Sequence, residues 1–222
     1  GLHKRGYRKR QGGAPIKETL AAAIIQISYW NKNRVLYDPF CGSGTIPIEA
    51  AMIARNIAPG LNREFACSHW PQLSKDLWKE LRQEAYDSID HDTPVNIQGS
   101  DIDREAVSVA RDNAMEAGVD DCINFFVKSI HKTELPRHEY GVIITNPPYG
   151  ERLSDKENVQ DLQSSLGKLF TSDDTWSLYA ITSATTFEHD LGKRANKKRK
   201  LFNGRIPAEL YQYFGPRPPR NN

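Results

Sequence analysis

Long apolar runs, cysteine and methionine are all scarce in this sequence of 222 residues. No stretch approaches the roughly 18 consecutive apolar residues of a membrane-spanning helix, and no signal-peptide pattern opens the chain. The three cysteines, Cys41, Cys67 and Cys122, show no Cys-x-x-Cys spacing, which favours reduced thiols and argues against a zinc site. We therefore expect a cytoplasmic protein without a metal. Because the first residue is Gly1 rather than methionine, we also expect a piece of a longer polypeptide.

Neither sign of charge dominates the whole chain, since 30 Lys or Arg residues balance 28 Asp or Glu residues. The basic residues gather near the two ends: five of the first ten residues are basic, and so are six of the eight from 193 to 200. Such clusters are typical of surfaces that contact phosphates. Solvated surface charge explains either cluster alone equally well.

Apolar periodicity predicts helices that alternate with strands. Helices are expected at 15–30, 46–56, 103–118 and 158–170, and strands at 35–37, 95–100, 124–129, 141–145 and 176–182. The segment 61–92, with a helix at 74–88, interrupts this order and is interpreted as an insertion. Two final strands, 199–202 and 209–214, predict a hairpin. The pattern indicates an α/β sheet that is mostly parallel, covered on both faces and closed by one reversed strand.

The most informative motif is DPFCGSGT, from Asp38 to Thr45, between the first strand and its helix. Open α/β sheets bind ligands at the carboxyl ends of their parallel strands, which is where this motif lies. Gly42 and Gly44 let a ligand approach the backbone closely. The lysine of a phosphate loop is absent, and so is the GxGxxG spacing of dinucleotide sites. Asp38 would repel a phosphate but would pair well with an ammonium group.

A second acidic position completes this prediction. Asp101 ends the second strand, where a carboxylate can accept hydrogen bonds from both ribose hydroxyls. Its neighbour Asp103 is expected to cap the following helix. A nucleoside with a cationic amino-acid tail fits both acidic positions. S-adenosylmethionine is such a molecule.

The motif NPPYG, from Asn146 to Gly150, follows the fourth strand of the predicted sheet. The side-chain carbonyl of Asn146 and the backbone carbonyl of Pro147 could accept both hydrogens of an exocyclic amine. Pro147 and Pro148 fix the backbone so that these acceptors are positioned in advance. Tyr149 would stack on the target base. The motif therefore predicts methyl transfer to an amino nitrogen beside a planar ring.

With these motifs the chain resembles the Rossmann-like RNA methyltransferases associated with THUMP domains, the group of bacterial 23S rRNA guanine-N2 methyltransferases. The resemblance rests on LHKRGYR, KETLAAA, DPFCGSGT, EAAMIA, GSDID, NPPYGERL and RKLFNGRI. It implies a class I methyltransferase fold, with a seven-stranded, mostly parallel sheet, one antiparallel strand near the C-terminus and helices on both faces. It also implies a basic linker at 1–14, from a missing RNA-binding domain, and a methyltransferase domain at 15–222.

The resemblance assigns roles to particular residues. The start of the first helix, Lys17 to Thr19, would close over the cofactor. Ser129 stands where related enzymes often place an aspartate against the adenine, so we expect weaker adenine recognition. The residues predicted to bind the cofactor are Thr19, Asp38, Phe40, Cys41, Gly42, Gly44, Thr45, Asp101, Ile102, Ser129 and Asn146. Those predicted to act on the base are Asn146, Pro147, Pro148 and Tyr149. Those predicted to bind RNA are Lys4, Arg5, Arg8, Lys9, Arg10, Lys197, Lys198 and Arg199.

The sequence thus predicts an S-adenosylmethionine-dependent RNA methyltransferase, with guanine N2 of 23S rRNA as the leading target. Two alternatives remain open. One is an adenine-N6 methyltransferase acting on DNA or RNA, because NPPY also occurs in such enzymes. The other is a catalytically silent RNA-binding module that retains the fold.

Overall fold

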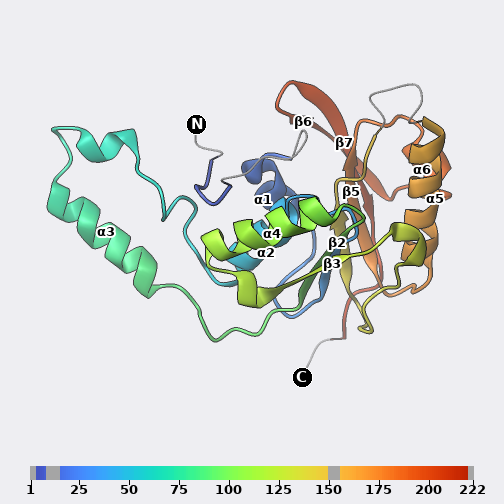
Figure 1. Ribbon diagram of the computed structural model, residues 1–222, viewed down its shortest axis with the longest axis horizontal. Coiled ribbons are helices and arrows are strands. Elements are labelled where there is room, and N and C mark those ends of the chain that lie inside the picture. The colour runs from blue at the N-terminus through green and yellow to red at the C-terminus, as the bar shows by residue number, and fades with distance from the viewer. Residues whose placement is uncertain (1–3, 9–15, 150–155, 220–222) are drawn as a thin grey trace.

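The computed structural model describes residues 4–8, 16–149 and 156–219. Its centre is a seven-stranded sheet with the order β3-β2-β1-β4-β5-β7-β6, shown in Figure 1. The first five strands in this order run parallel to one another, and β7 runs antiparallel to both β5 and β6. This confirms the predicted fold class. The strands are β1 (Leu36–Asp38), β2 (Ile97–Asp101), β3 (Ile123–Val127), β4 (Val142–Thr145), β5 (Ser177–Thr182), β6 (Lys197–Asn203) and β7 (Ile206–Tyr213).

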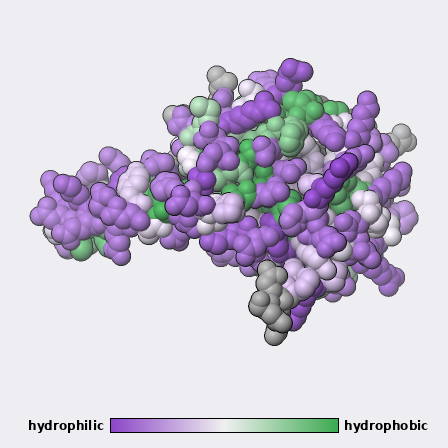
Figure 2. Space-filling model, turned by 90° about the horizontal axis from the view of Figure 1, so that it is seen from below, coloured by the Kyte–Doolittle hydropathy of each residue, from purple (hydrophilic) through white to green (hydrophobic). Residues whose placement is uncertain are grey.

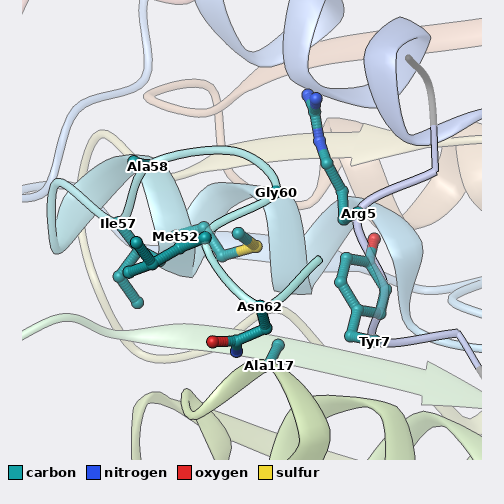
Figure 3. A pocket seen from close by; sticks show the side chains of 9 residues that line it. Arg5, Tyr7, Met52, Ile57, Ala58, Gly60, Asn62 and Ala117 are labelled. Carbon is teal, nitrogen blue, oxygen red and sulfur yellow. The ribbon is translucent and has the colours of Figure 1, made fainter. Parts of the chain in front are cut away.

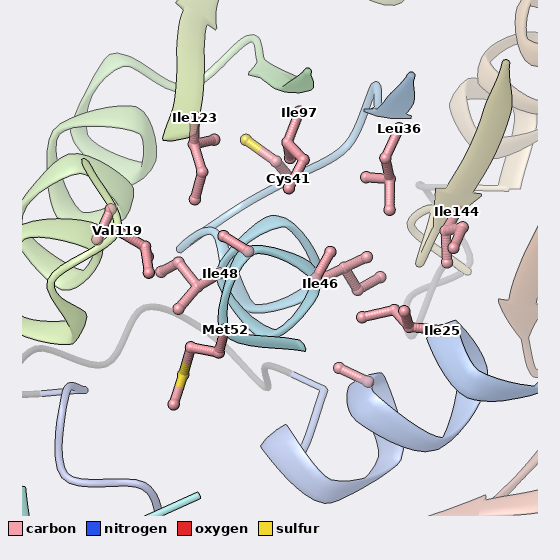
Figure 4. Close-up of a cluster of buried hydrophobic side chains, with 14 of the residues drawn as sticks. Ile25, Leu36, Cys41, Ile46, Ile48, Met52, Ile97, Val119, Ile123 and Ile144 are labelled. Carbon is pink, nitrogen blue, oxygen red and sulfur yellow. The ribbon is translucent and has the colours of Figure 1, made fainter. Parts of the chain in front are cut away.

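Helices cover both faces of the sheet because alternate residues of its buried strands point to opposite sides. In β4, for example, Ile144 belongs to one apolar cluster and Ile143 to the other. The first cluster, part of which is drawn in Figure 4, packs the sheet against α1 (Glu18–Ile27), α2 (Thr45–Ala54) and α4 (Arg104–Ala117). The second packs it against α5 (Lys156–Thr171) and the short α6 (Phe187–Leu191).

The C-terminal hairpin is longer than its sequence suggests. Its strands begin at Lys197 and Ile206, and Pro207 lies within β7 opposite Phe202. Proline cannot donate a backbone hydrogen bond, so it is confined to unpaired edges. Pro207 satisfies this rule because the pairing between β5 and β7 ends at Glu209. The hairpin therefore extends beyond β5.

The segment between α2 and β2 forms an arm that projects from the body of the protein (Figure 1). It contains a 3-10 turn at Ala66–His69 and α3 (Lys75–Asp87). Ser74 caps α3, since its hydroxyl accepts from the amides of Asp76 and Leu77. None of the residues of α3 is buried, and Figure 2 shows the arm to be mainly hydrophilic on that side. Among the described residues, no helix has the length and apolar character to cross a membrane.

Candidate active site

The two motifs singled out in the sequence lie side by side. Strands β1 and β4 pair in parallel, with Leu36 opposite Val142 and Tyr37 opposite Ile143. DPFCGSGT and NPPYG therefore leave the same edge of the sheet. A hydrogen bond joins their starting points, because the Thr145 hydroxyl donates to Asp38 Oδ1 at 2.7 Å. Thr145 was not predicted as a site residue; it is a buried polar residue at the end of an otherwise apolar strand.

Asp38 is the last residue of β1, at the carboxyl edge of the sheet, and is only 1 % exposed. The backbone amide of Phe40 also donates to Oδ1, at 3.1 Å, so both hydrogen bonds end on the same oxygen. Burial raises the pKa of Asp38 from 3.8 to about 7, although these hydrogen bonds oppose the shift. The site therefore contains a carboxyl group that a nearby cation would ionise.

The glycine turn holds the backbone of residues 41–44 at the carboxyl edge of the sheet. Gly42 and Gly44 have φ values of +50° and +82°, in the left-handed region. The Gly44 amide closes the turn on the Cys41 carbonyl at 2.8 Å. From α4, the buried Asn113 donates to the Ser43 carbonyl at 3.0 Å. Asn113 was also missed in the sequence, since nothing in its local pattern points to the turn.

The surroundings of the two glycines differ and give a prediction. A Cβ at Gly44 would lie 3.0 Å from both Ala110 and Phe125, whereas a Cβ at Gly42 meets nothing within 4 Å. Gly44→Ala should therefore lower the free energy of unfolding by about 2 to 5 kcal/mol, from strain and overpacking together. Gly42→Ala should cost only about 1 to 2 kcal/mol of stability, because strain acts alone. Urea unfolding of both variants checks this difference, and equal losses would contradict the distinct packing.

Asp101 faces the glycine turn from the end of β2. Its Oδ2 accepts from the Gly42 amide and its Oδ1 from the Asp103 amide, both at 3.0 Å. The carboxylate is thus oriented by backbone on both sides. Asp103 caps α4 as predicted, because its Oδ1 accepts from the Glu105 amide at 2.8 Å. The amide of Lys128 donates to the Asp101 carbonyl at 2.9 Å, which brings the end of β3 beside this position.

The remaining predicted cofactor residues differ in exposure. The Cys41 side chain is buried in the core, so only its backbone is available at the turn. Ile102 is 72 % exposed. Phe40 and Ser129 are half-buried, and Thr19 is exposed in the first turn of α1.

The NPPY residues extend from the end of β4 with graded burial. Pro147 is buried and Pro148 exposed, while Asn146 and Tyr149 are half-buried. Gly150 lies outside the described residues. The buried proline fixes the backbone immediately after Asn146, next to the bond between Thr145 and Asp38.

Two arginines predicted to bind RNA turn inward instead. Arg5 pairs with Glu49 of α2 at 3.4 Å, and the hydroxyl of the buried Tyr7 donates to Glu49 at 3.0 Å. Figure 3 shows Arg5 and Tyr7 among the residues that line a pocket at this position. Burial raises the pKa of Glu49, and Arg5 opposes the shift. Arg5 is therefore paired within the fold rather than presented to phosphates.

Arg8 is held in the same way at the start of α2. Its guanidinium donates to the Thr45 hydroxyl and, at 3.1 Å, to the Ile16 carbonyl. Its Nε lies 3.9 Å from Glu18, and the Arg8 side chain is 9 % exposed. A buried guanidinium needs such partners, which corrects the expectation that Arg8 faces RNA. Lys9 and Arg10 lie outside the described residues.

The other predicted RNA contacts are on the surface. Lys4 is exposed in the N-terminal segment, and Lys197, Lys198 and Arg199 are exposed along β6. Lys198 forms an ion pair with Glu188 of α6 at 2.9 Å. The basic edge of the sheet therefore comes from β6.

The sheet order and the two motifs at its carboxyl edge define a class I methyltransferase domain. The chain belongs to the family described as "RMKL-like, methyltransferase domain", whose model matches residues 5–212. This confirms the family predicted from the sequence.

Relatives agree with this assignment. "Putative RNA methyltransferase YpsC" of Bacillus subtilis is 51 % identical over 96 % of this chain and 55 % of that protein. "Ribosomal RNA large subunit methyltransferase K/L" of Legionella pneumophila is 39 % identical over 95 % of this chain and 30 % of that protein. The structure titled "SMU.472, a putative methyltransferase complexed with SAH" has a TM-score of 0.92 and 44 % identity, covering 98 % of this chain and 57 % of that one. Its SAH agrees with the cofactor predicted from the sequence. The chain thus spans about half the length of two of these relatives and about a third of the Legionella protein.

Proposed function

We propose that this protein is an S-adenosylmethionine-dependent RNA methyltransferase that modifies an exocyclic amino group, with guanine N2 of 23S rRNA as its target. The hydrogen bond between Thr145 and Asp38 carries this proposal, because it places the start of the cofactor motif against the start of the base motif. The rRNA assignment is supported by the name of the Legionella relative. Exposed basic residues on β6 supply phosphate contacts.

The residues at the edge fit the cofactor. The space above Gly42 is open, which admits a ligand against the backbone. Asp101 already accepts one backbone hydrogen bond on each oxygen and retains lone pairs for two ribose hydroxyls. Among the described residues, both hydrogen bonds to Asp38 end on Oδ1, so Oδ2 is the oxygen available to an ammonium group.

S-adenosylmethionine, when bound, supplies an electrophilic methyl group. The protein then has to hold the amine in place and direct its lone pair toward that methyl. Asn146 accepts one amine hydrogen through its side-chain oxygen, and the Pro147 carbonyl accepts the other. Tyr149 stacks on the ring, which keeps the base flat against the site. The amine proton leaves after transfer, so the reaction needs no general base before it.

Asp101→Ala tests the cofactor half of the site. The variant should weaken S-adenosylmethionine binding by about 1 to 3 kcal/mol, because the ribose hydroxyls lose their acceptor and the Gly42 amide loses its partner. Isothermal titration calorimetry measures the change. Asp103→Ala is the control, since it removes the α4 cap without changing the proposed ribose contact and should leave the affinity within about twofold. Unchanged affinity in Asp101→Ala would remove this residue from the site.

Methylation of rRNA tests the proposal as a whole. The protein is incubated with S-adenosylmethionine and rRNA from a strain that lacks its gene, and the nucleosides are analysed by mass spectrometry. N2-methylguanosine in 23S rRNA is the expected product, and mapping locates the modified nucleotide. N6-methyladenosine would favour the adenine alternative. Absence of cofactor binding at millimolar concentration would instead favour a silent RNA-binding module.

A further inference from the structure

The tip of the β6–β7 hairpin, residues 202–206, reaches past the rest of the sheet at its carboxyl edge. The last pair between β5 and β7 joins Thr182 to Glu209, and β7 begins three residues earlier, at Ile206. At about 3.4 Å per residue, the tip extends roughly 10 Å beyond the end of β5. Figure 1 shows the hairpin rising above the sheet toward α1.

Contacts tie this tip to the candidate active site. The Lys17 amide donates to Asn203 Oδ1 at 3.3 Å, and a Cβ at Gly204 would lie 3.4 Å from Lys17 Cε. The adjacent Ile16 carbonyl accepts from Arg8, which also contacts Thr45 at the start of α2. Three hydrogen bonds, between Asn203 and Lys17, Ile16 and Arg8, and Arg8 and Thr45, thus connect the tip with the end of the glycine turn. The hairpin tip is therefore linked to the candidate active site through the start of α1 and the N-terminal segment.

The tip presents an aromatic ring to solvent. Phe202 is 65 % exposed and belongs to neither apolar cluster of the described residues. It lies opposite Pro207 in the hairpin. A phenyl ring has only two side-chain torsions, so little conformational entropy is lost when a flat partner packs on it. Isolated exposed apolar residues are common and do not by themselves indicate a binding site. The inference therefore depends on the charged residues near this ring.

Basic side chains precede and follow the ring along the hairpin. Lys200 lies two residues before Phe202 and therefore on the same face of the strand, while Arg199 lies on the other face. Both are exposed, and so is Arg205 in the turn. Cations flanking an exposed aromatic ring disfavour an apolar protein surface as the partner. Proteins that bind single-stranded nucleic acids use this combination, with cations on the phosphates and aromatic rings under the bases.

We propose that Phe202 stacks on an unpaired RNA base next to the target nucleotide, while Arg199, Lys200 and Arg205 bind the adjoining phosphates. The inference rests on the proposed function, because RNA is the substrate. Strand spacing of about 4.8 Å separates β6 from β4 by roughly 14 Å across the sheet. That distance assigns the ring to a flanking base rather than to the base held by Asn146. The hairpin thereby selects substrates in which the nucleotides around the target are unpaired.

Fluorescence anisotropy with a labelled 12-nucleotide single-stranded RNA of mixed sequence tests the inference on the 222-residue protein. Phe202→Ala should weaken binding about tenfold, within the range measured for loss of one stacked base. Phe202→Trp should restore it, because the larger ring preserves stacking. The slope of log affinity against log salt should stay unchanged in Phe202→Ala, whereas Arg199→Gln and Lys200→Gln should each reduce it by about one.

Two comparisons make the result decisive. Tyr29→Ala removes a ring of similar exposure, 69 %, which packs against Phe214 after the end of β7 that is far from the hairpin tip, and should leave RNA affinity unchanged. A fully paired RNA duplex should bind the wild-type protein and Phe202→Ala equally. The inference would be overturned if Phe202→Ala bound single-stranded RNA within twofold of the wild-type affinity. It would also be overturned if Tyr29→Ala weakened that binding as much as Phe202→Ala does. Because anisotropy requires no methyl transfer, such an outcome is distinct from failure of the proposed reaction.

Discussion

Replacing Asn146 with alanine should reduce methyl transfer by about 100-fold or more and leave cofactor affinity within a fewfold. The side-chain oxygen is proposed to accept a hydrogen from the target amine only when the base is in place. Loss of one preorganised polar group of this kind typically costs about 100-fold to 1000-fold in rate. Asn146 is half-buried directly after β4 and is not part of the glycine turn. Single-turnover rates with rRNA, together with calorimetry for the cofactor, separate the two effects.

Asn146→Asp provides the control for this result. Aspartate keeps an acceptor oxygen at the same place, so it should retain more activity than alanine does. Both variants should unfold at nearly the wild-type temperature, since the side chain contributes little to the core. If Asn146→Ala lost cofactor affinity and turnover to the same extent, its assignment to the target base would be wrong.

Asp38→Asn should weaken cofactor binding by about 10-fold to 100-fold while leaving the fold intact. Asparagine keeps Oδ1, which accepts from Thr145 and Phe40, and replaces only Oδ2. What disappears is the negative charge proposed to pair with the ammonium group, and a charge-assisted hydrogen bond contributes about 1.5 to 3 kcal/mol. Calorimetry at pH 8 measures the loss. Asp103→Asn makes the same change in charge on an exposed cap and should have little effect.

The pH dependence of cofactor affinity provides an independent check on Asp38. The pKa of its carboxyl is raised to about 7 in the protein without ligand, and a bound ammonium group would lower it. Binding therefore requires loss of a proton below pH 7, and wild-type affinity should fall by up to about tenfold per pH unit there. Asp38→Asn should lack this dependence. An affinity that is independent of pH in both proteins would make Asp38 a structural residue that holds Thr145.

Stability should change with pH through the same group. The unfolded carboxyl titrates near 3.8 and the folded one near 7, so the folded state binds the proton more tightly. The free energy of unfolding contributed by Asp38 is therefore fully present below about pH 4 and is lost as the pH rises to 7. Asp38→Asn should remove this part of the pH dependence, which urea unfolding at several pH values detects.

The order of elements and the ends of the strands were predictable because they depend on local patterns. Asp38 and Asp101 each follow an apolar run, and parallel strands bring their carboxyl ends to one edge. Asp103 was predictable as a cap because an aspartate stands directly before an amphipathic helix. The Pro-Pro pair likewise marks where β4 has to end.

Contacts between distant segments were not predictable. The bond between Thr145 and Asp38 depends on the register of strands 107 residues apart in the sequence. Arg5 and Arg8 look like solvated charge in the sequence because their acidic partners, Glu18 and Glu49, belong to otherwise apolar helices. Only the packing of α1 against α2 reveals that these charges meet. The packing of α4 against α2 likewise brings Asn113 to the glycine turn.

The buried pairs of Arg5 and Arg8 also fasten the N-terminal segment to the sheet domain. Tyr7 is 3 % exposed within the main apolar cluster, so residues 4–8 pack against the domain. Glu18 and Glu49 would be left as buried acids without these arginines, which is costly in a protein interior. Any shortened or recombined form of the domain has to retain this segment. A swap of the basic N-terminus between relatives would exchange internal counterions along with surface charge.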